Sequence, residues 1–296
     1  MYEPHDFVAD MAQNFFKARM TYDIAIIMVS YNKIVEECLP SVKRAIAASS
    51  LRIGFVLVDN GSPDLRAHEF VKEHLPDAVV ILRDQNYGFG NSCNRAVQEV
   101  DAEFYFLLNP DTVLVDDTIL DRMHAFMREK PWTGIVAPRI HHMTGELQET
   151  HRRFPKWYMP IVQRTMIANS VFGRKYADRF LMRERVLRDR RLVDWVQGSA
   201  MFISSALYKE LDGFDDRFWM YFEDIDLCRR AWERRRPVYY YPDVVLHHAY
   251  GKASATPGGY VKNLFTNRPL RAHIMSWIRY TWKWRPFSGR AVTTHS

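Results

Sequence analysis

The feature that most constrains the fold is a set of four short apolar runs near the start of the chain, each ending in polar or turn-forming residues. Their apolarity is continuous rather than alternating, which is typical of strands covered on both faces of a parallel sheet. Helical patterns at 35–48, 65–74 and 91–100 separate them. This order predicts an α/β fold with a mainly parallel, doubly wound sheet flanked by helices. The runs are 24–29, 55–58, 79–82 and 104–108.

The rest of the chain continues this pattern less regularly. We expect helices at 117–129, 205–211, 225–235 and about 261–284, and strands at 134–138, 193–196, 200–203, 238–241 and 244–246. The 296 residues allow one large α/β domain. We therefore predict a main α/β domain at 21–255 with a basic aromatic insertion at 151–191. An amphipathic extension at 1–20 precedes it, and a basic aromatic helical segment at 256–296 follows it.

The net charge of +6 is unevenly distributed. Residues 151–191 hold twelve Lys or Arg against three acids, and residues 244–296 hold eight against none. The remaining body is acidic, which disfavours a nucleic-acid partner. Basic flanks of this kind favour a membrane surface or an anionic substrate.

Three observations bear on the compartment. No apolar run reaches the roughly 18 residues that span a bilayer, and the first residues lack a basic start and an apolar signal core. The three cysteines, Cys38, Cys93 and Cys228, share no disulfide or metal-ligand spacing. We expect a cytoplasmic protein.

Polar clusters follow the apolar runs, where doubly wound sheets bind their ligands. Asp59 ends the second run, and its carboxylate can accept the imide N–H of a pyrimidine base, although Asn60-Gly61 is equally a turn signal. The glycines of Asn86-Tyr87-Gly88-Phe89-Gly90 allow close approach to a ligand at a helix start. A dinucleotide-binding loop is disfavoured, because Cys93 replaces its last glycine.

Two acidic clusters are the candidate centres of chemistry. Asp111, in Asn109-Pro110-Asp111, is a candidate ligand of Mg²⁺ or Mn²⁺, with a turn as the alternative. Glu223, Asp224 and Asp226 precede an arginine-rich helix, where they supply a general base or only complement the helix dipole. A histidine near 247–248 can complete a metal site across from Asp111, or be a packed core residue.

The basic aromatic tail has two interpretations that the sequence leaves open. Tryptophans among Lys and Arg suit the interface of an anionic bilayer. The same residues can instead form a helix packed on the main domain. Phe7, Met11 and Phe15, spaced by four, invite the same two interpretations.

Taken in order, these motifs resemble those of the inverting, GT-A-fold glycosyltransferases of family 2, and within them the bacterial O-antigen rhamnosyltransferases that use dTDP-L-rhamnose. The similarity runs from about residue 22 to residue 250. Its parts are Val29-Ser30-Tyr31-Asn32, Val58-Asp59-Asn60-Gly61-Ser62, Asn86-Tyr87-Gly88-Phe89-Gly90, Leu108-Asn109-Pro110-Asp111, Val193-Asp194-Trp195, Gly198-Ser199, Gly213-Phe214-Asp215 and Phe218 to Cys228.

The resemblance implies a role for each site residue. Asp224 is the catalytic base, and Asp111 with His248 holds a divalent metal, with His247 as the fallback. The first acid of the family's Asp-x-Asp metal motif is Asn109 here, so metal ligation depends on Asp111. The implied nucleotide and donor contacts are Ser30, Tyr31, Asn32, Asp59, Asn86, Gly88, Asn109 and Asp111. The implied acceptor and supporting contacts are Trp195, Gly198, Glu223 and Asp226.

The resemblance also implies the reaction: direct displacement with inversion, from a nucleotide-sugar donor to a hydroxyl of a saccharide on a polyprenyl diphosphate. This places the protein peripherally at the inner face of the cell membrane. Two other functions stay open at this point. A nucleotidyltransferase of similar fold is disfavoured because Ser30-Tyr31-Asn32-Lys33 has no glycine-rich triphosphate loop. A non-catalytic membrane scaffold is disfavoured because all the candidate acids are present.

Overall fold

The computed structural model describes residues 22–32, 35–63, 66–158, 170–182, 189–248 and 267–285. The predicted extension at 1–20, part of the 151–191 insertion and much of the 256–296 segment lie outside the described residues. In the described part of the chain, no helix has the length and apolar character needed to cross a bilayer.

The first half of the chain forms the predicted parallel sheet. Strands β1 (Tyr22–Ser30), β2 (Ile53–Asp59), β3 (Val79–Leu82) and β4 (Ala102–Leu108) pair in the order β3-β2-β1-β4, all parallel. Helices α2 (Leu39–Ala48), α3 (Arg66–His74) and α4 (Phe89–Ala96) connect them. Helix α2 begins at Leu39 rather than the expected residue 35, because Pro40 favours the first helical turn.

The second half adds mixed strands to the same sheet. The order continues β4-β11-β6-β12-β5, where β11 (Ala200–Ser204) is antiparallel to both neighbours and β6 (Ile135–His142) is parallel to β12. Strand β12 (Val238–His248) is one element with a bulge between Tyr241 and Val245, where two strands were expected. The short strands β5 (Thr112–Leu114), β7 (Leu147–Gln148) and β9 (Arg191–Val193) also pair in this sheet, whereas β8 (His151–Arg152) and β10 (Trp195–Val196) form a separate two-stranded sheet.

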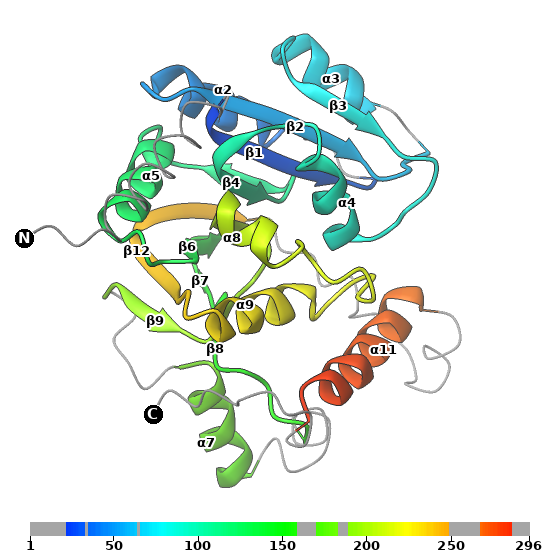
Figure 1. The fold of residues 1–296 in the computed structure, drawn as a ribbon, viewed down its shortest axis with the longest axis vertical. Helices are drawn as coiled ribbons and strands as arrows, with labels where there is room; N and C mark the ends of the chain where they lie inside the picture. Colours follow the sequence, from blue (N-terminus) through cyan, green and yellow to red (C-terminus); the bar gives the residue numbers. More distant parts are fainter. Residues whose placement is uncertain are drawn as a thin grey trace, which may run out of the picture.

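Helices cover both faces of the sheet (Figure 1). Ala25 and Ile27 of β1 pack in one core with α4, α8 (Ser205–Glu210) and α9 (Glu223–Glu233). Ile24 and Ile26 pack in the other core with α2, α3 and α5 (Ile119–Glu129). Since alternate residues of one strand enter opposite cores, the continuous apolar runs are explained, and the α/β prediction is confirmed.

Two further helices belong to the regions that the sequence marked as basic and aromatic. Helix α7 (Val171–Phe180) lies in the 151–191 insertion, where no element was expected, and Ser170 caps it by accepting from the Gly173 N–H. Helix α11 (Arg268–Lys283) lies in the C-terminal segment, and Asn267 caps it by accepting from the Leu270 N–H. Leu270, Ser276 and Tyr280 of α11 are buried, so this helix packs on the α/β body.

Candidate active site

The ends of β1 and β2 place a carboxylate beside a short backbone turn. Ser30 pairs with Asp59 across the two strands, and both side chains are buried. The Asp59 Oδ1 accepts from the Ser62 N–H at 2.8 Å. Its Oδ2 is also buried and has no hydrogen-bond partner among the described residues. A buried carboxylate oxygen in this state is suited to a ligand that brings an N–H or O–H donor.

The two residues after Ser30 lie at the same strand end. Asn32 has a left-handed backbone (φ 51°), and its N–H donates to the Ser62 Oγ at 3.0 Å. The Tyr31 side chain is 43% exposed. The structure therefore brings three of the predicted nucleotide contacts, Tyr31, Asn32 and Asp59, to one turn.

The loop after β3 is held by asparagine side chains. The Asn86 Oδ1 accepts from the Gly88 N–H at 2.9 Å and from the Asn60 Nδ2 at 3.0 Å. The Asn60 Oδ1 in turn accepts from the Tyr87 N–H at 3.0 Å. The oxygen of Asn86 is thus used within the protein, and Asn86 braces the loop beside the Asp59 turn.

The Gly88 position is tight for a reason that the sequence did not reveal. Gly88 has φ 91°, and a Cβ there would lie 2.0 Å from the Trp219 carbonyl oxygen. The glycine was expected to admit a ligand, but the group that approaches it closely is the protein's own 218–222 segment. This corrects the reason given for the glycine. The contact links the loop at 86–90, called the donor loop after its predicted role, to the C-terminal half.

Asp111 reaches its predicted histidine through the short strand β5. The chain turns at Asn109-Pro110-Asp111 and returns as β5, which pairs Thr112 with His248 of β12. The His248 Nε2 lies 3.0 Å from the Asp111 Oδ1, and the imidazole is almost fully buried. His248, and not His247, is therefore the histidine beside Asp111.

Gln148 of β7 orients that imidazole. Its Nε2 donates to the His248 carbonyl at 3.0 Å, and its Oε1 lies 3.1 Å from the His248 Nδ1. The amide oxygen can only accept, so the network assigns the proton to Nδ1. The Nε2 lone pair then faces a carboxylate oxygen, and a shared proton or a cation is needed to hold the two together.

The donor set at Asp111 fits a divalent cation as a pair of ligands. One carboxylate oxygen and one imidazole nitrogen suit Mn²⁺ and allow other positions for a substrate's oxygens. No cluster of three or more such side chains was found in the described residues. A metal bound here would need ligands from the donor as well as from the protein.

Asp224 is fixed at the first turn of α9. Its Oδ2 accepts from the Gly198 N–H at 3.1 Å, and its Oδ1 accepts from the Ile225 N–H at 2.8 Å. Burial raises the pKa of this carboxyl, while the two backbone N–H groups and the charge of Arg152 partly oppose that shift. The carboxylate is accordingly a better proton acceptor than an ordinary aspartate.

One turn connects the two acidic clusters. Gly198 donates to Asp224, and the carbonyl of the adjacent Ser199 accepts from the Asn109 N–H at 2.9 Å. Thr112, directly after Asp111, donates its Oγ1–H to the same carbonyl at 3.4 Å. The structure thus places the loop that carries Asp111 and the helix start that carries Asp224 on either side of a two-residue turn.

Glu223, next to Asp224, is 7% exposed, and its Oε2 has no hydrogen-bond partner among the described residues. Burial and the neighbouring Asp224 hold its pKa well above the usual range. It lies inside the protein, so it can support Asp224 without contacting an acceptor itself.

Asp226 and Trp195 occupy places different from those expected. Asp226 is completely buried and bonds to Arg230 at 2.8 Å, to the Lys283 Nζ at 2.7 Å and to the Trp284 Nε1 at 2.9 Å. Trp195 is 4% exposed and donates its Nε1–H to the Arg153 carbonyl. We therefore correct the expected acceptor contacts: Asp226 anchors α11, and Trp195 supports β8.

Sequence reasoning missed Gln148 and Arg152. Gln148 sits on a two-residue strand that has no hydrophobic pattern. Arg152 counted only toward the charge of the 151–191 segment, yet it lies over the Trp195 ring at 5.3 Å and contributes a positive charge near Asp224. Neither residue carries a sequence signal of its own, so only its contacts in the folded chain identify it.

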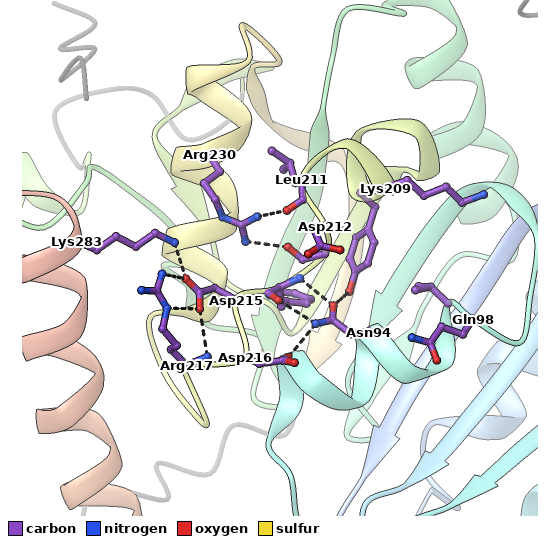
Figure 2. Close-up of a pocket in the computed structure, with 14 residues that line it drawn as sticks. Asn94, Gln98, Lys209, Leu211, Asp212, Asp215, Asp216, Arg217, Arg230 and Lys283 are labelled. Carbon is purple, nitrogen blue, oxygen red and sulfur yellow. Dashed lines mark hydrogen bonds and ion pairs between the residues drawn. The ribbon is translucent and has the colours of Figure 1, made fainter. Parts of the chain in front are cut away.

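A cavity of about 740 Å³ lies away from these residues, between α4, the end of α8 and the 211–217 loop (Figure 2). Asn94 bridges its wall, accepting from the Tyr208 OH at 2.6 Å and donating to the Phe214 carbonyl at 2.8 Å. Arg230 is bound to the Leu211 and Gly213 carbonyls. Its wall includes none of the predicted site residues, and these wall groups are bonded to one another.

Comparisons with known proteins bear on the family of the chain. The chain is 24% identical over 93% of its length to N-acetylglucosaminyl-diphospho-decaprenol L-rhamnosyltransferase of Mycobacterium tuberculosis, covering 93% of that protein. It is 26% identical to rhamnosyltransferase WbbL of Escherichia coli K12, over 69% of this chain and 74% of that one.

A solved structure shows the same fold. The mannosyltransferase PcManGT from Pyrobaculum calidifontis, in complex with GDP-Man and Mn²⁺, superposes with a TM-score of 0.53 at 16% identity, over 92% of this chain and 71% of that one. The family model described as "Glycosyltransferase like family 2" matches residues 22–267. The chain therefore belongs to the family 2 glycosyltransferases, with the GT-A fold of its structural neighbours.

Proposed function

We propose that this enzyme is an inverting glycosyltransferase that transfers L-rhamnose from dTDP-L-rhamnose to a hydroxyl of a lipid-linked saccharide, in the synthesis of a cell-surface polysaccharide. The observation that carries the proposal is the 198–199 turn, which bonds both to Asp224 and to the loop of Asp111. The names of the two rhamnosyltransferase relatives support the donor sugar, and the mycobacterial name supports a polyprenyl-linked acceptor.

Asp59 is the proposed anchor of the nucleotide base. Its buried Oδ2 suits the imide N–H of thymine. Tyr31 and Asn32 lie at the same turn, and Ser30 pairs with Asp59 at the strand end. Asn86 and Gly88 shape the loop beside them. These residues bind and orient the donor so that its diphosphate lies toward Asn109 and Asp111.

Asp224 is the proposed general base. It takes the proton from the acceptor hydroxyl as the oxygen attacks the anomeric carbon. The bond from that carbon to the diphosphate oxygen breaks, and the departing dTDP keeps the electron pair. Attack from the opposite face inverts the anomeric configuration. The raised pKa of Asp224 brings its basicity closer to that needed at neutral pH.

Asp111 and His248 are the proposed protein ligands of Mg²⁺ or Mn²⁺. A divalent cation held there supplies positive charge that stabilises the charge developing on the leaving diphosphate. The lone pair of the oriented His248 and the Asp111 carboxylate support this assignment. Gln148 keeps the imidazole in the tautomer that such binding needs.

Helix α11 is the proposed contact with the membrane surface, which places the enzyme peripherally at the cytoplasmic face. Its outer side carries Met275, Ile278 and Trp282, which are 47%, 46% and 63% exposed. Arg271 and Arg285 are exposed around them, and no acid occurs in the helix. Exposed apolar residues with basic neighbours suit an anionic bilayer. The three cysteines are free and buried, which suits a reducing compartment.

The decisive experiment is a transfer assay with purified protein, radiolabelled dTDP-L-rhamnose and a polyprenyl-diphosphate N-acetylglucosamine acceptor. We expect a product with inverted anomeric configuration, dependent on Mn²⁺ or Mg²⁺. Uridine and guanosine sugar donors serve as matched competitors. Efficient transfer from one of these, with none from dTDP-L-rhamnose, would reject the rhamnosyl assignment. Pyrophosphate release from a sugar phosphate and dTTP would instead indicate a nucleotidyltransferase.

A further inference from the structure

The segment that leads into Asp224 has a strained end. Tyr221 and Phe222 are consecutive non-glycine residues with left-handed backbones, at φ 65° and φ 66°. For L-residues this conformation is unfavourable, because it brings the Cβ too close to the following carbonyl oxygen. It persists only where surrounding contacts overdetermine it. Because Phe222 is the residue before α9, these two residues set the direction in which Glu223 and Asp224 leave the loop.

Helix α11 contacts this segment along most of its length. The His273 ring lies 5.0 Å from Tyr221 and 5.6 Å from Phe222. The Ser276 Oγ donates to the Met220 carbonyl at 2.9 Å. Tyr280 packs against Phe222 with ring centroids 5.3 Å apart. The strained residues are therefore held from one side by successive turns of a helix that is distant in sequence.

A buried charge cluster fixes the C-terminal end of α11 to both ends of the same region. Lys283, whose side chain is 8% exposed, bonds to Asp215 at 2.6 Å and to Asp226 at 2.7 Å. Asp215 lies before the strained residues, and Asp226 follows Asp224 on α9. Burial opposes the shift, but hydrogen bonds from Arg217 and Lys283 hold the pKa of Asp215 well below its usual range. Figure 2 shows Lys283 reaching Asp215 from α11.

The other side of the segment rests on the donor loop. The Trp219 Nε1 donates to the Asn86 carbonyl at 3.0 Å, and the Trp219 carbonyl lies against Gly88. The guanidinium of Arg268, in the first turn of α11, lies 4.3 Å from the Trp219 ring centre. Contacts thus run from α11 through the 215–222 segment to the donor loop and to Asp224.

We propose that α11 is a positioning element for catalysis, in which His273, Ser276 and Lys283 hold the 215–222 segment so that Asp224 and the donor loop keep their relative placement. None of these three residues touches the reacting atoms, so they are positioning residues. The inference rests on the proposed role of Asp224 as the base. It assigns the inner face of α11 to catalysis and leaves the outer face to the membrane.

The two faces of α11 offer matched variants. His273→Ala and Ser276→Ala remove contacts of the inner face with residues 220–222, and Lys283→Met removes the ion pairs with Asp215 and Asp226. Lys283→Arg keeps the charge and is the conservative rescue. Met275→Ala and Ile278→Ala change the outer face. Val71→Ala on α3, in the opposite core, controls for a general loss of stability.

Two readouts test the proposal on the full chain. Hydrogen exchange reports on residues 86–91 and 214–226 without any need for turnover. Steady-state assays with a water-soluble acceptor analogue separate kcat from KM in the absence of a membrane. We expect the inner-face variants to speed exchange in both segments and to lower kcat by about tenfold to a hundredfold, because small displacements of a base are costly. The acceptor KM should change by less than about threefold, since binding contacts are kept.

The outcomes separate the two proposals. Hydrogen exchange and kcat at wild-type values in the inner-face variants would overturn the positioning role. An equal loss of kcat in the inner-face, outer-face and Val71→Ala variants would also overturn it. If Lys283→Met fails to fold, Ser276→Ala and His273→Ala still decide. A further outcome is that the wild type transfers no sugar while the inner-face variants still speed hydrogen exchange at 86–91 and 214–226. In that case the proposed function fails, and the proposal that α11 holds these two segments stands.

Discussion

Asp224 and Asp226 stand two residues apart at the start of α9 and face opposite environments. On the side of the 198–199 turn, Asp224 accepts from two backbone N–H groups of the described residues, those of Gly198 and Ile225, and burial raises its pKa. On the side of α11, Asp226 is bound by Lys283, Arg230 and Trp284. An acid that is paired directly with cations has a structural role. An acid that is buried and bonded only to backbone donors has a raised pKa and is suited to accept a proton.

The largest expected effect comes from removing the charge of Asp224. Asp224→Asn should lower kcat by about 10²–10⁴-fold, the usual contribution of a general base. Binding of dTDP, followed by calorimetry, should stay near the wild-type value, because the nucleotide contacts lie at the β1 and β2 ends. Full activity in this variant would remove Asp224 from its proposed role.

Asp226→Asn should act chiefly on stability, and it should lower kcat only as far as the loss of its Lys283 contact displaces Asp224. Removing one member of a buried ion-pair cluster leaves Lys283 and Arg230 short of a partner, at a cost of about 3–5 kcal/mol in the free energy of unfolding. Urea denaturation of both variants measures this. A greater loss of stability in Asp224→Asn than in Asp226→Asn would contradict the comparison.

Gln148→Ala should weaken the metal site by about 10–100-fold in affinity, the usual effect of losing a group that orients a ligating histidine. Titration of activity with Mn²⁺ and the Mn²⁺-dependent thermal shift both report it. Gln98→Ala, a glutamine on the wall of the separate cavity, is the matched control and should bind Mn²⁺ as the wild type does. Equal Mn²⁺ affinities in the two variants would show that Gln148 does not orient a ligand.

The smallest effect concerns pH. The folded-state pKa values of Glu223 and Asp224 lie above their unfolded values of about 4.3 and 3.9, so their contribution to stability is complete below about pH 4 and is lost as pH rises through the raised values. Asp215 behaves in the opposite way: its stabilisation is present above about pH 4 and is lost as pH falls. Glu223→Gln should reduce the fall in the free energy of unfolding at high pH, measured by urea unfolding between pH 5 and 9. An unchanged slope would place the titration elsewhere.

The sequence predicted the architecture because apolar runs and their polar ends follow local rules. The four parallel strands and the turn at Asp59 lie where the runs ended. The residues themselves suggested a histidine at 247 or 248 opposite Asp111, and the family motifs selected His248, which the structure places beside Asp111.

What the sequence could not supply were contacts between distant segments. Strands β5, β7 and β8 are two or three residues long and form only because β12, β6 and β10 lie beside them. The role of Asp226 depends on Lys283, which follows it by 57 positions. Helix α11 packs on the main domain, which is one of the two interpretations of the tail, and the membrane contact of its exposed outer side stays a proposal.

The irregularity in β12 has a consequence for comparing this enzyme with its relatives. Pairing with β6 skips residues between Tyr241 and Val245, then continues regularly to His248. Because successive strand residues point to opposite sides, the number of residues in that interruption determines which of the two adjacent imidazoles meets Asp111. Relatives that differ in length here should be aligned by strand pairing and not by letter matching, since a shift of one position would equate side chains that point in opposite directions.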